Sequence, residues 1–341
     1  IDANISDWNG VATECGEENR GGWWDKYIDI QTAITRDTQT AFAQFVFGGS
    51  LTNEVESVTR IRPRTPLAFG NAIVALREDC PNSATGGVHI DGGPDLIVKG
   101  GGIYSNACLV AGGTAVNVEV YDGENYCVGE GCYDYAGNPS VHPAPDETAS
   151  PLPPDAFAVP TPNCDLVPEQ GSHSGGGNIQ PGRYSQIRIN NTNDILHLAP
   201  GLYCVDGTVR FNGGTVEGNR VTIYLTNGDF DTAGNAFITL SSPPTRCGEP
   251  DCPPAIPGVL IYMAEGNEGE VTLMGTSDSQ FTGVVYAPSG LIEVGGTSSE
   301  LSEIHAQLIG DTVRVHGNTM INITFKGEEN YQMPAKLELF K

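Results

Sequence analysis

The sequence predicts a mainly β chain: a parallel β-solenoid, wound as a right-handed β-helix, with a small N-terminal α+β unit. Short runs that end in a glycine corner recur at 271–276, 292–297 and 313–318. Each run has a β-branched residue, an apolar residue two positions later, then glycine and a small polar residue. The last two copies start at 292 and 313, which is 21 residues apart. A period of this size is typical of one coil repeated along a solenoid.

Other apolar runs support the same fold class. Residues 221–225 and 258–263 are almost wholly apolar, as expected for strands covered on both faces. Most runs are only a few residues long and are separated by turns, so a coil with about three faces is expected. Glycine at the corners permits the tight turns between faces.

Residues 1–78 form the predicted N-terminal unit, which lacks the solenoid pattern. Residues 27–34 and 55–62 alternate with period two and predict strands. Between them, 37–48 shift to helical spacing, and Asp37 or the next residue caps the start of the expected helix. A strand–helix–strand unit is therefore predicted.

Composition divides the rest of the chain into three parts. Residues 79–136 hold the first solenoid coils, 137–170 are rich in proline, and 171–341 form the main solenoid with a C-terminal strand. The middle part carries nine prolines, which have no N–H for a central strand ladder. A flexible linker and an ordered strap along the solenoid both fit this composition. The strap is favoured by four apolar anchors that a free linker does not need: Phe157, Val159, Leu166 and Val167.

The charge narrows the choice of partners. The chain carries 42 acidic and 17 basic residues, for a net charge of −25. Nucleic acid and anionic membrane surfaces would be repelled. We interpret the charge as a means of solubility, with cation binding as the alternative.

The nine cysteines predict disulfides and an extracellular location. Two CxxxxC loops rich in glycine and acidic residues lack the spacing of a zinc site, so local disulfides are expected there. Two further pairs join more distant cysteines, and Cys15 is left over, either free or linked to a neighbour. The predicted pairs are Cys127–Cys132, Cys247–Cys252, Cys164–Cys204 and Cys80–Cys108.

Catalytic patterns are missing from the sequence. Glu293 and Arg314 are one coil apart and predict a surface cross-strand pair. Asp229 and Asp231 flank a turn and are interpreted as solvated turn acids. The six histidines are scattered, and nucleophile, zinc-protease, phosphate-loop and EF-hand motifs are absent. We therefore predict no catalytic residue, no cofactor and no metal site.

Eight segments, taken in order, carry a resemblance to one family. They are DTQTAFAQFVFGG (37–49), VESVT (55–59), FGNAIVAL (69–76), SPLPPD (150–155), GVLIY (258–262), FTGVVYAP (281–288), IEVGG (292–296) and VRVHGN (313–318). The chain resembles TadE/TadG-like bacterial pilus-assembly and surface proteins. The resemblance implies a non-enzymatic envelope or extracellular protein. That family has a hydrophobic N-terminal helix, expected ahead of residue 1, and any membrane contact is expected through it.

Three functions follow as hypotheses. The first is a structural subunit that self-associates into a filament, pilus-like fibre or sheath through solenoid ends and edges. The alternating C-terminal segment 335–341 is expected to be a strand, and it could be donated to a neighbouring subunit. The second is an adhesin that binds surface polysaccharide, and the third is a β-helix polysaccharide lyase or hydrolase. The expected assembly residues are Leu337, Leu339, Phe340, Trp23 and Trp24, and the tryptophan pair fits either interface packing or sugar stacking.

Overall fold

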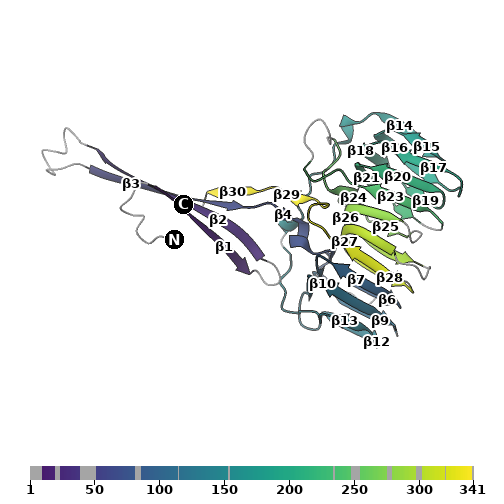
Figure 1. The fold of residues 1–341 in the computed structure, drawn as a ribbon, viewed down its shortest axis with the longest axis horizontal. Helices are drawn as coiled ribbons and strands as arrows, with labels where there is room; N and C mark the ends of the chain where they lie inside the picture. Colours follow the sequence, from purple (N-terminus) through teal and green to yellow (C-terminus); the bar gives the residue numbers. More distant parts are fainter. Residues whose placement is uncertain are drawn as a thin grey trace. The chain divides into compact units, whose positions relative to one another are not determined.

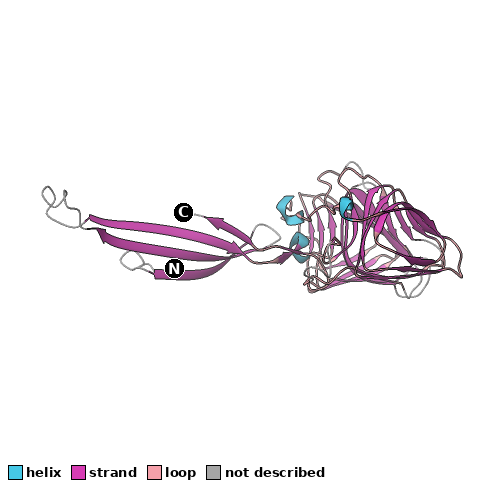
Figure 2. Cartoon of the chain, turned by 90° about the horizontal axis from the view of Figure 1, so that it is seen from above, coloured by secondary structure: helices cyan, strands magenta, loops and turns pink. Residues whose placement is uncertain are grey.

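The computed structural model describes residues 10–19, 24–38, 51–80, 86–113, 115–152, 154–232, 235–246, 254–274, 279–296, 302–318 and 320–339. Within these residues the chain is mainly β, and helix is limited to three short 3-10 turns (Figure 2). None of the described helices is long and apolar enough to cross a membrane. The turns are η2 (Leu67–Gly70), η3 (Pro154–Phe157) and η4 (Cys164–Leu166).

The chain folds as two compact units. Ile1–Thr65 and Met333–Lys341 form the first, and Pro66–Gln332 form the second. We call them the antiparallel unit and the parallel unit, after the direction of their strands. The boundary predicted at residue 78 lies too far along the chain, because β5 (Ile73–Ala75) already pairs inside the parallel unit.

The antiparallel unit is a four-stranded sheet in the order β1-β2-β3-β30 (Figure 1). Both strands predicted from alternation, within β2 and β3, are confirmed. The C-terminal strand is confirmed too, and here it pairs with β3 of its own chain, with Leu337 opposite Ile61. The strands are β1 (Gly10–Asn19), β2 (Trp24–Thr38), β3 (Leu51–Arg62) and β30 (Lys336–Leu339).

The helix predicted over residues 37–48 is wrong at its start. β2 continues to Thr38 in antiparallel register with β3. The Asp37 carboxylate accepts a hydrogen bond from the Thr52 hydroxyl at 2.6 Å, so it bonds across the strands instead of capping a helix. The long strand pairing satisfies the backbone groups here, and tertiary contacts of this kind override weak local propensity. The rest of the predicted helix, 39–48, lies outside the described residues.

The parallel unit is a large sheet whose strands lie in three parallel stacks. The long strands β26 (Gln280–Gly296) and β27 (Ser302–Gly317) take part in all three, and β16 (Gly182–Ile189) takes part in the first two. The first stack adds β18 (Gly201–Asp206), β21 (Val221–Asn227), β24 (Val259–Met263), β5, β8 (Ile103–Ser105) and β11 (Asn125–Cys127). The second adds β19 (Val209–Phe211), β22 (Phe230–Thr232), β25 (Glu270–Leu273), β6 (Gly87–Gly92), β9 (Leu109–Gly113) and β12 (Tyr133–Gly137). The third adds β15 (Gly177–Ile179), β17 (Ile195–Leu198), β20 (Thr215–Asn219), β23 (Phe237–Ser241), β28 (Met320–Thr324), β7 (Asp95–Lys99), β10 (Asn117–Tyr121) and β13 (Ser140–His142).

Three short strands complete the description. β14 (Glu169–Ser174) pairs in parallel with β16 at one end of the stacks. The two-residue strands β4 (Thr65–Pro66) and β29 (Gln332–Met333) form a separate two-stranded sheet.

Two blocks of sequence join in the middle of the stacks. The block from β5 to β13 does not continue into β14, which begins the second block at the far end. Instead, the last strands of the second block pair with the first strands of the first block: Leu308 lies opposite Ile73, Val313 opposite Val88, and Ile321 opposite Leu96. The stacks therefore end at β11–β13 on one side and at β14 and β15 on the other.

A buried glutamine helps to hold this junction. Gln307 of β27 is completely buried, and its amide nitrogen donates to the carbonyl oxygens of Leu67 at 2.8 Å and Asn71 at 2.7 Å. Its backbone N–H donates to the side-chain oxygen of Asn330 at 3.1 Å. The two bonds from the amide nitrogen join residues more than 200 positions apart, and a buried amide that lost them would be strongly unfavourable.

The 21-residue spacing is confirmed as the register between neighbouring strands of the second stack. Ile292 lies opposite both Val271 and Val313, and Val88 continues the row. All four side chains are completely buried. Rows of β-branched residues thus form the core, and each contributes about 25 cal/mol for every Å² of apolar surface removed from water.

The proline-rich segment is an ordered strap, as favoured by its apolar residues. It leaves β13 at one end of the stacks and leads to β14 at the other. Along the way the Tyr104 hydroxyl donates to the Ser150 carbonyl, and the Leu152 N–H donates to the Asn106 side chain at 3.0 Å. Further along, the Cys164–Cys204 disulfide ties the strap to β18.

The predicted anchors of the strap are only partly right. Val167 is buried, and Phe157 and Val159 are half-buried. Leu166 is 64% exposed, because it lies in the one-turn helix η4, with its side chain left to solvent. The better anchors are Leu152 and Ala156, which are almost completely buried.

Because the backbone of neighbouring strands is tightly stacked, we predict that alanine substitutions at two glycines reduce the stability of the protein by different amounts. Gly87 and Gly266 have similar left-handed φ angles of 80° and 82°, but a Cβ on Gly87 would lie 2.0 Å from the Cys108 carbonyl oxygen, whereas one on Gly266 meets nothing within 4 Å. We expect Gly266→Ala to lower the free energy of unfolding by about 1 kcal/mol, the cost of a left-handed alanine. Gly87→Ala should cost several times more, as measured by urea denaturation. Equal losses would contradict the stacking.

Candidate assembly surface

The register of the antiparallel unit sorts its side chains onto two opposite faces. Successive side chains of a strand point to opposite sides, and residues directly opposite each other share a side. Even-numbered residues of β2 therefore share a face with odd-numbered residues of β1, β3 and β30. We call this the apolar face, and its apolar residues are Val11, Cys15, Trp24, Ile28, Ile30, Ile34, Val55, Ile61, Leu337 and Leu339.

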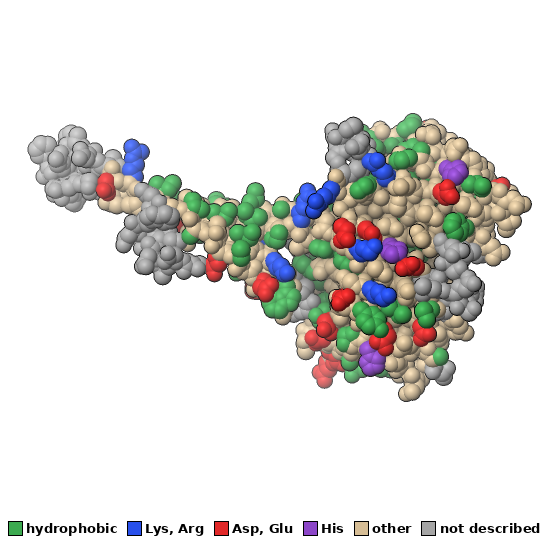
Figure 3. All heavy atoms as spheres, in the orientation of Figure 1, with side chains coloured by type: hydrophobic (Ala, Val, Ile, Leu, Met, Phe, Trp, Pro, Cys, Tyr) green, Lys and Arg blue, Asp and Glu red, His purple; other side chains and the backbone are tan. Residues whose placement is uncertain are grey.

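Much of the apolar face is open to solvent. Figure 3 shows hydrophobic side chains gathered over the strands of this sheet. Contiguous exposed apolar surface of this kind marks an interaction site in soluble proteins. Six large side chains are at least half exposed: Val11 59%, Trp24 51%, Ile34 54%, Val55 62%, Leu337 73% and Leu339 77%.

The opposite side, which we call the polar face, is held by ion pairs between strands. Arg60 of β3 contacts Asp29 of β2 at 2.8 Å, and its guanidinium lies 3.7 Å above the ring of Tyr27. Arg62 contacts Asp25 at 3.0 Å and also pairs with Glu338 of β30. The hydrogen bond from Arg60 lowers the pKa of Asp29. These bonds link β2, β3 and β30 across the polar face of the sheet, where Asp25 is buried.

Most acidic residues of the antiparallel sheet lie on one of its two faces. By the same register, the apolar face carries only Glu17, Lys26 and Arg36 among its ionisable acids and bases. Lys336 and the two arginines of the ion pairs are the basic residues of the polar face. Its acidic residues are Glu14, Glu18, Asp25, Asp29, Asp37, Glu54, Glu56 and Glu338.

The structure brings three of the predicted assembly residues together. Trp24, Leu337 and Leu339 come from opposite ends of the chain but lie on the same apolar face. Trp23 and Phe340 lie outside the described residues. The leftover cysteine, Cys15, is free and exposed, and it occupies this face opposite Ile28.

Sequence reasoning missed Val11, Ile34 and Val55 as surface residues. The signal was present, because the strands alternate strictly enough to separate two faces. Alternation predicts that one face is buried, however, and only the pairing of the strands reveals that none of the described residues covers these three side chains.

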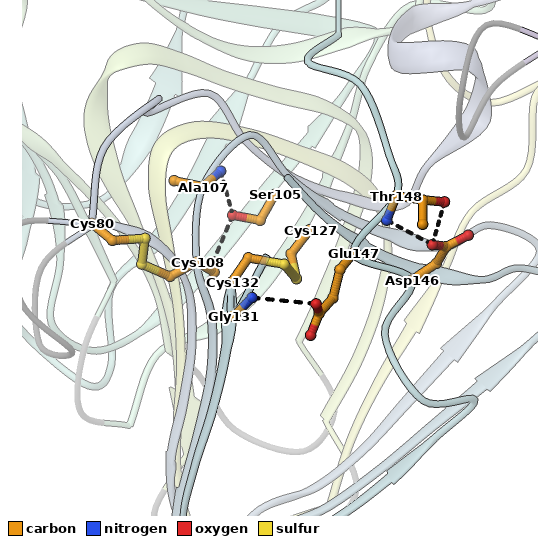
Figure 4. Close-up of a disulfide and its surroundings, with 10 residues drawn as sticks. All are labelled: Cys80, Ser105, Ala107, Cys108, Cys127, Gly131, Cys132, Asp146, Glu147 and Thr148. Atoms are coloured by element: carbon orange, nitrogen blue, oxygen red, sulfur yellow. Dashed lines mark hydrogen bonds between the residues drawn. A yellow bond between two sulfur atoms is a disulfide. The ribbon is translucent and has the colours of Figure 1, made fainter. Parts of the chain in front are cut away.

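Three predicted disulfides are confirmed: Cys80–Cys108, Cys127–Cys132 and Cys164–Cys204. Figure 4 shows the first two beside the strap, where the Glu147 carboxylate accepts from the Gly131 N–H at 3.2 Å. The predicted Cys247–Cys252 pair lies outside the described residues. Three disulfides in one chain indicate an oxidising environment.

The parallel unit carries one cluster of charged residues on its second stack. Arg314 of β27 contacts Glu293 of β26 at 3.2 Å, which confirms the predicted pair, and also Asp91 of β6 at 2.8 Å. His316 lies 3.3 Å from Glu293. Burial, and a hydrogen bond shared with Glu293, raise the pKa of Glu270. The cluster borders a groove of about 1020 Å³ that is lined by Asp91, Arg314 and their neighbours.

The acids that were considered for catalysis have structural bonds. Asp231 contacts Arg210 at 2.7 Å, and Asp229 accepts the N–H of Glu270 at 3.0 Å. Across the described ranges, no group of three or more His, Cys, Asp or Glu side chains could hold a metal ion. The Glu270–Glu293 pair was missed by sequence reasoning, because the glutamates are 23 positions apart and meet only through the register of β25 and β26.

Comparison with known proteins adds one match. Residues 176–328 match a family described as Domain of unknown function (DUF7305). The matched part runs from β15 to β28 and so covers most of the second block of the parallel unit. No curated protein and no solved structure matches the chain.

The raised pKa of Glu270 predicts the pH dependence of stability. A carboxyl whose folded-state pKa is raised stabilises the fold fully below its ordinary value of 4.5, and this contribution is lost as pH rises through the folded pKa. Glu270→Gln, which keeps a hydrogen-bonding group but no charge, should therefore raise the melting temperature at neutral pH and leave it unchanged in acid.

Asp206→Asn serves as a control of opposite sign. Hydrogen bonds from Asn227 and Thr226 lower the pKa of Asp206, so its stabilising effect is present at neutral pH and lost in acid. This variant should lower the melting temperature at neutral pH only. The same sign of change in both variants would contradict the environment assigned to Glu270.

Proposed function

We propose that this chain is a non-enzymatic structural subunit of an extracellular bacterial assembly, attached to its neighbours through the apolar face. The single observation that carries the proposal is the exposure of that face. A β-sheet with one apolar side is stable when a second layer covers it. In the described part of the chain, Ile34, Val55, Leu337 and Leu339 remain more than half exposed, so the missing layer comes from a partner.

The parallel unit supports this role as a rigid body. We propose that its three stacks are the faces of a right-handed β-solenoid with three strands in each coil. Its buried rows of valine and isoleucine, its three disulfides and its strap all resist deformation. Its charged cluster consists of cross-strand pairs, which suit a scaffold.

The ends of the stacks offer a second, weaker route of contact. Within the described residues, β12 pairs only with β9, and β14 pairs only with β16. Each of these strands thus has an edge with backbone groups available for strand addition. The chain's resemblance to TadE/TadG-like surface proteins fits a place in a pilus-linked assembly.

Electron microscopy of surface material from the source cells, labelled with antibodies against this chain, tests the proposal. We expect labels to repeat along extracellular polymers or sheaths, and the chain to sediment with that fraction. Val55→Asp should remove the chain from the fraction, because a charge on the apolar face opposes its burial. Val58→Asp, the same change on the polar face of the same strand, should leave it there.

Two outcomes would contradict the proposal. One is a chain found only as free protein in the medium. The other is loss of both valine variants from the surface fraction while each still melts like the wild type, since the apolar face would then have no special role.

A further inference from the structure

We infer that the partner covering the apolar face is the apolar face of a second copy of this chain, so that two sheets pack into a two-layer β-sandwich. The inference rests on the proposed function, and it names the partner. Two identical faces that meet around a two-fold axis form a closed, isologous contact, the commonest arrangement of homo-oligomers. Stacked sheets pack about 10 Å apart with their inner side chains interdigitated.

The size of the face suits such a pair. The longest strand, β2, has 15 residues. At roughly 3.3 Å per residue this extends about 50 Å, and three strands about 4.8 Å apart span roughly 15 Å, which gives a face of roughly 700 Å². A standard protein interface buries about 800 Å² on each partner. One copy of the face is therefore large enough for a specific dimer without help from other surfaces.

The distribution of charge favours a second copy as the occupant. A chain with a net charge of −25 is repelled by another like it over most of its surface. The charged residues of the apolar face are Glu17, which lies opposite Lys26, and Arg36, and the other acids of the sheet lie on the polar face. When two apolar faces meet, the acids of both polar faces lie on the outer sides of the pair, away from the contact. The sheet can thus bury its apolar side chains without burying unpaired carboxylates.

A lipid surface fits the sheet less well. Within the described residues β1 pairs only with β2, and β30 only with β3, so the sheet has two open edges. In the hydrocarbon of a bilayer those unpaired N–H and C=O groups would each cost several kcal/mol. Between two protein layers the edges stay at the rim, where water satisfies them.

Cys15 provides a local probe of the contact. Its thiol is free and exposed, and it lies on the apolar face in the middle of β1, opposite Ile28. In the two-copy arrangement the second sheet covers it. Its reaction with a bulky maleimide should therefore slow down as the protein concentration rises, because dimer formation removes the exposed form.

Sedimentation velocity of the purified full chain, over a range of concentrations, tests the inference together with Cys15 labelling located by mass spectrometry. We expect a monomer–dimer equilibrium and a concentration-dependent labelling rate at Cys15. Val55→Asp and Ile34→Asp should each weaken the dimer by about 100-fold or more, and should make labelling fast at every concentration. Val58→Asp should match the wild type. Melting curves would establish that all three variants are folded.

The outcomes separate this inference from the proposed function. A wild-type chain that stays monomeric, with Cys15 labelled equally fast at every concentration, overturns the second-copy contact, even if microscopy places the chain in surface polymers. A monomer that floats with phosphatidylcholine vesicles would overturn it in favour of a lipid partner. A dimer that Val55→Asp disrupts supports the contact, even if the chain is absent from surface polymers and the proposed function fails.

Discussion

The parallel ladder between β27, β28 and the strands β5 to β7 is the contact on which the rest of the fold depends. It joins the first block of strands, β5 to β13, to the end of the second block, which lies far away in the sequence. The buried side chain of Gln307 supports this contact with two hydrogen bonds. Because the chain both enters and leaves the stacks at this junction, β30 can return to β3 and complete the antiparallel sheet. The same junction also requires the strap, because the first block ends at β13 and the second block begins with β14 at the opposite end of the stacks.

The two units bury their apolar residues in different ways. In the parallel unit, each strand has a neighbour above and below, so rows such as Val271, Ile292 and Val313 are buried within one chain. The antiparallel unit has a single layer, and among the described residues of its four strands only Ala33 and Asp25 are buried. Its polar face is completed by ion pairs, whereas its apolar face is complete only with a second layer.

Local sequence patterns predicted the structure correctly where a pattern is compatible with only one kind of element. Alternation identified β2 and β3, and the 21-residue repeat identified the register of the second stack. It failed at Asp37, whose carboxylate caps helices in many proteins but bonds here to a residue 15 positions away. It also missed the Glu270–Glu293 pair, which depends on the register of distant strands.

The sequence by itself determined that the chain is mainly β, which strands alternate, which of the described cysteines pair, and that the charge is strongly acidic. Each of these depends on composition or on short-range periodicity. Only the tertiary structure decided that the two blocks of stacked strands join in reverse order, and that Trp24, Leu337 and Leu339 share one face. Those features depend on backbone pairing between residues hundreds of positions apart, and the backbone N–H and C=O groups that make a ladder are the same in almost every residue type.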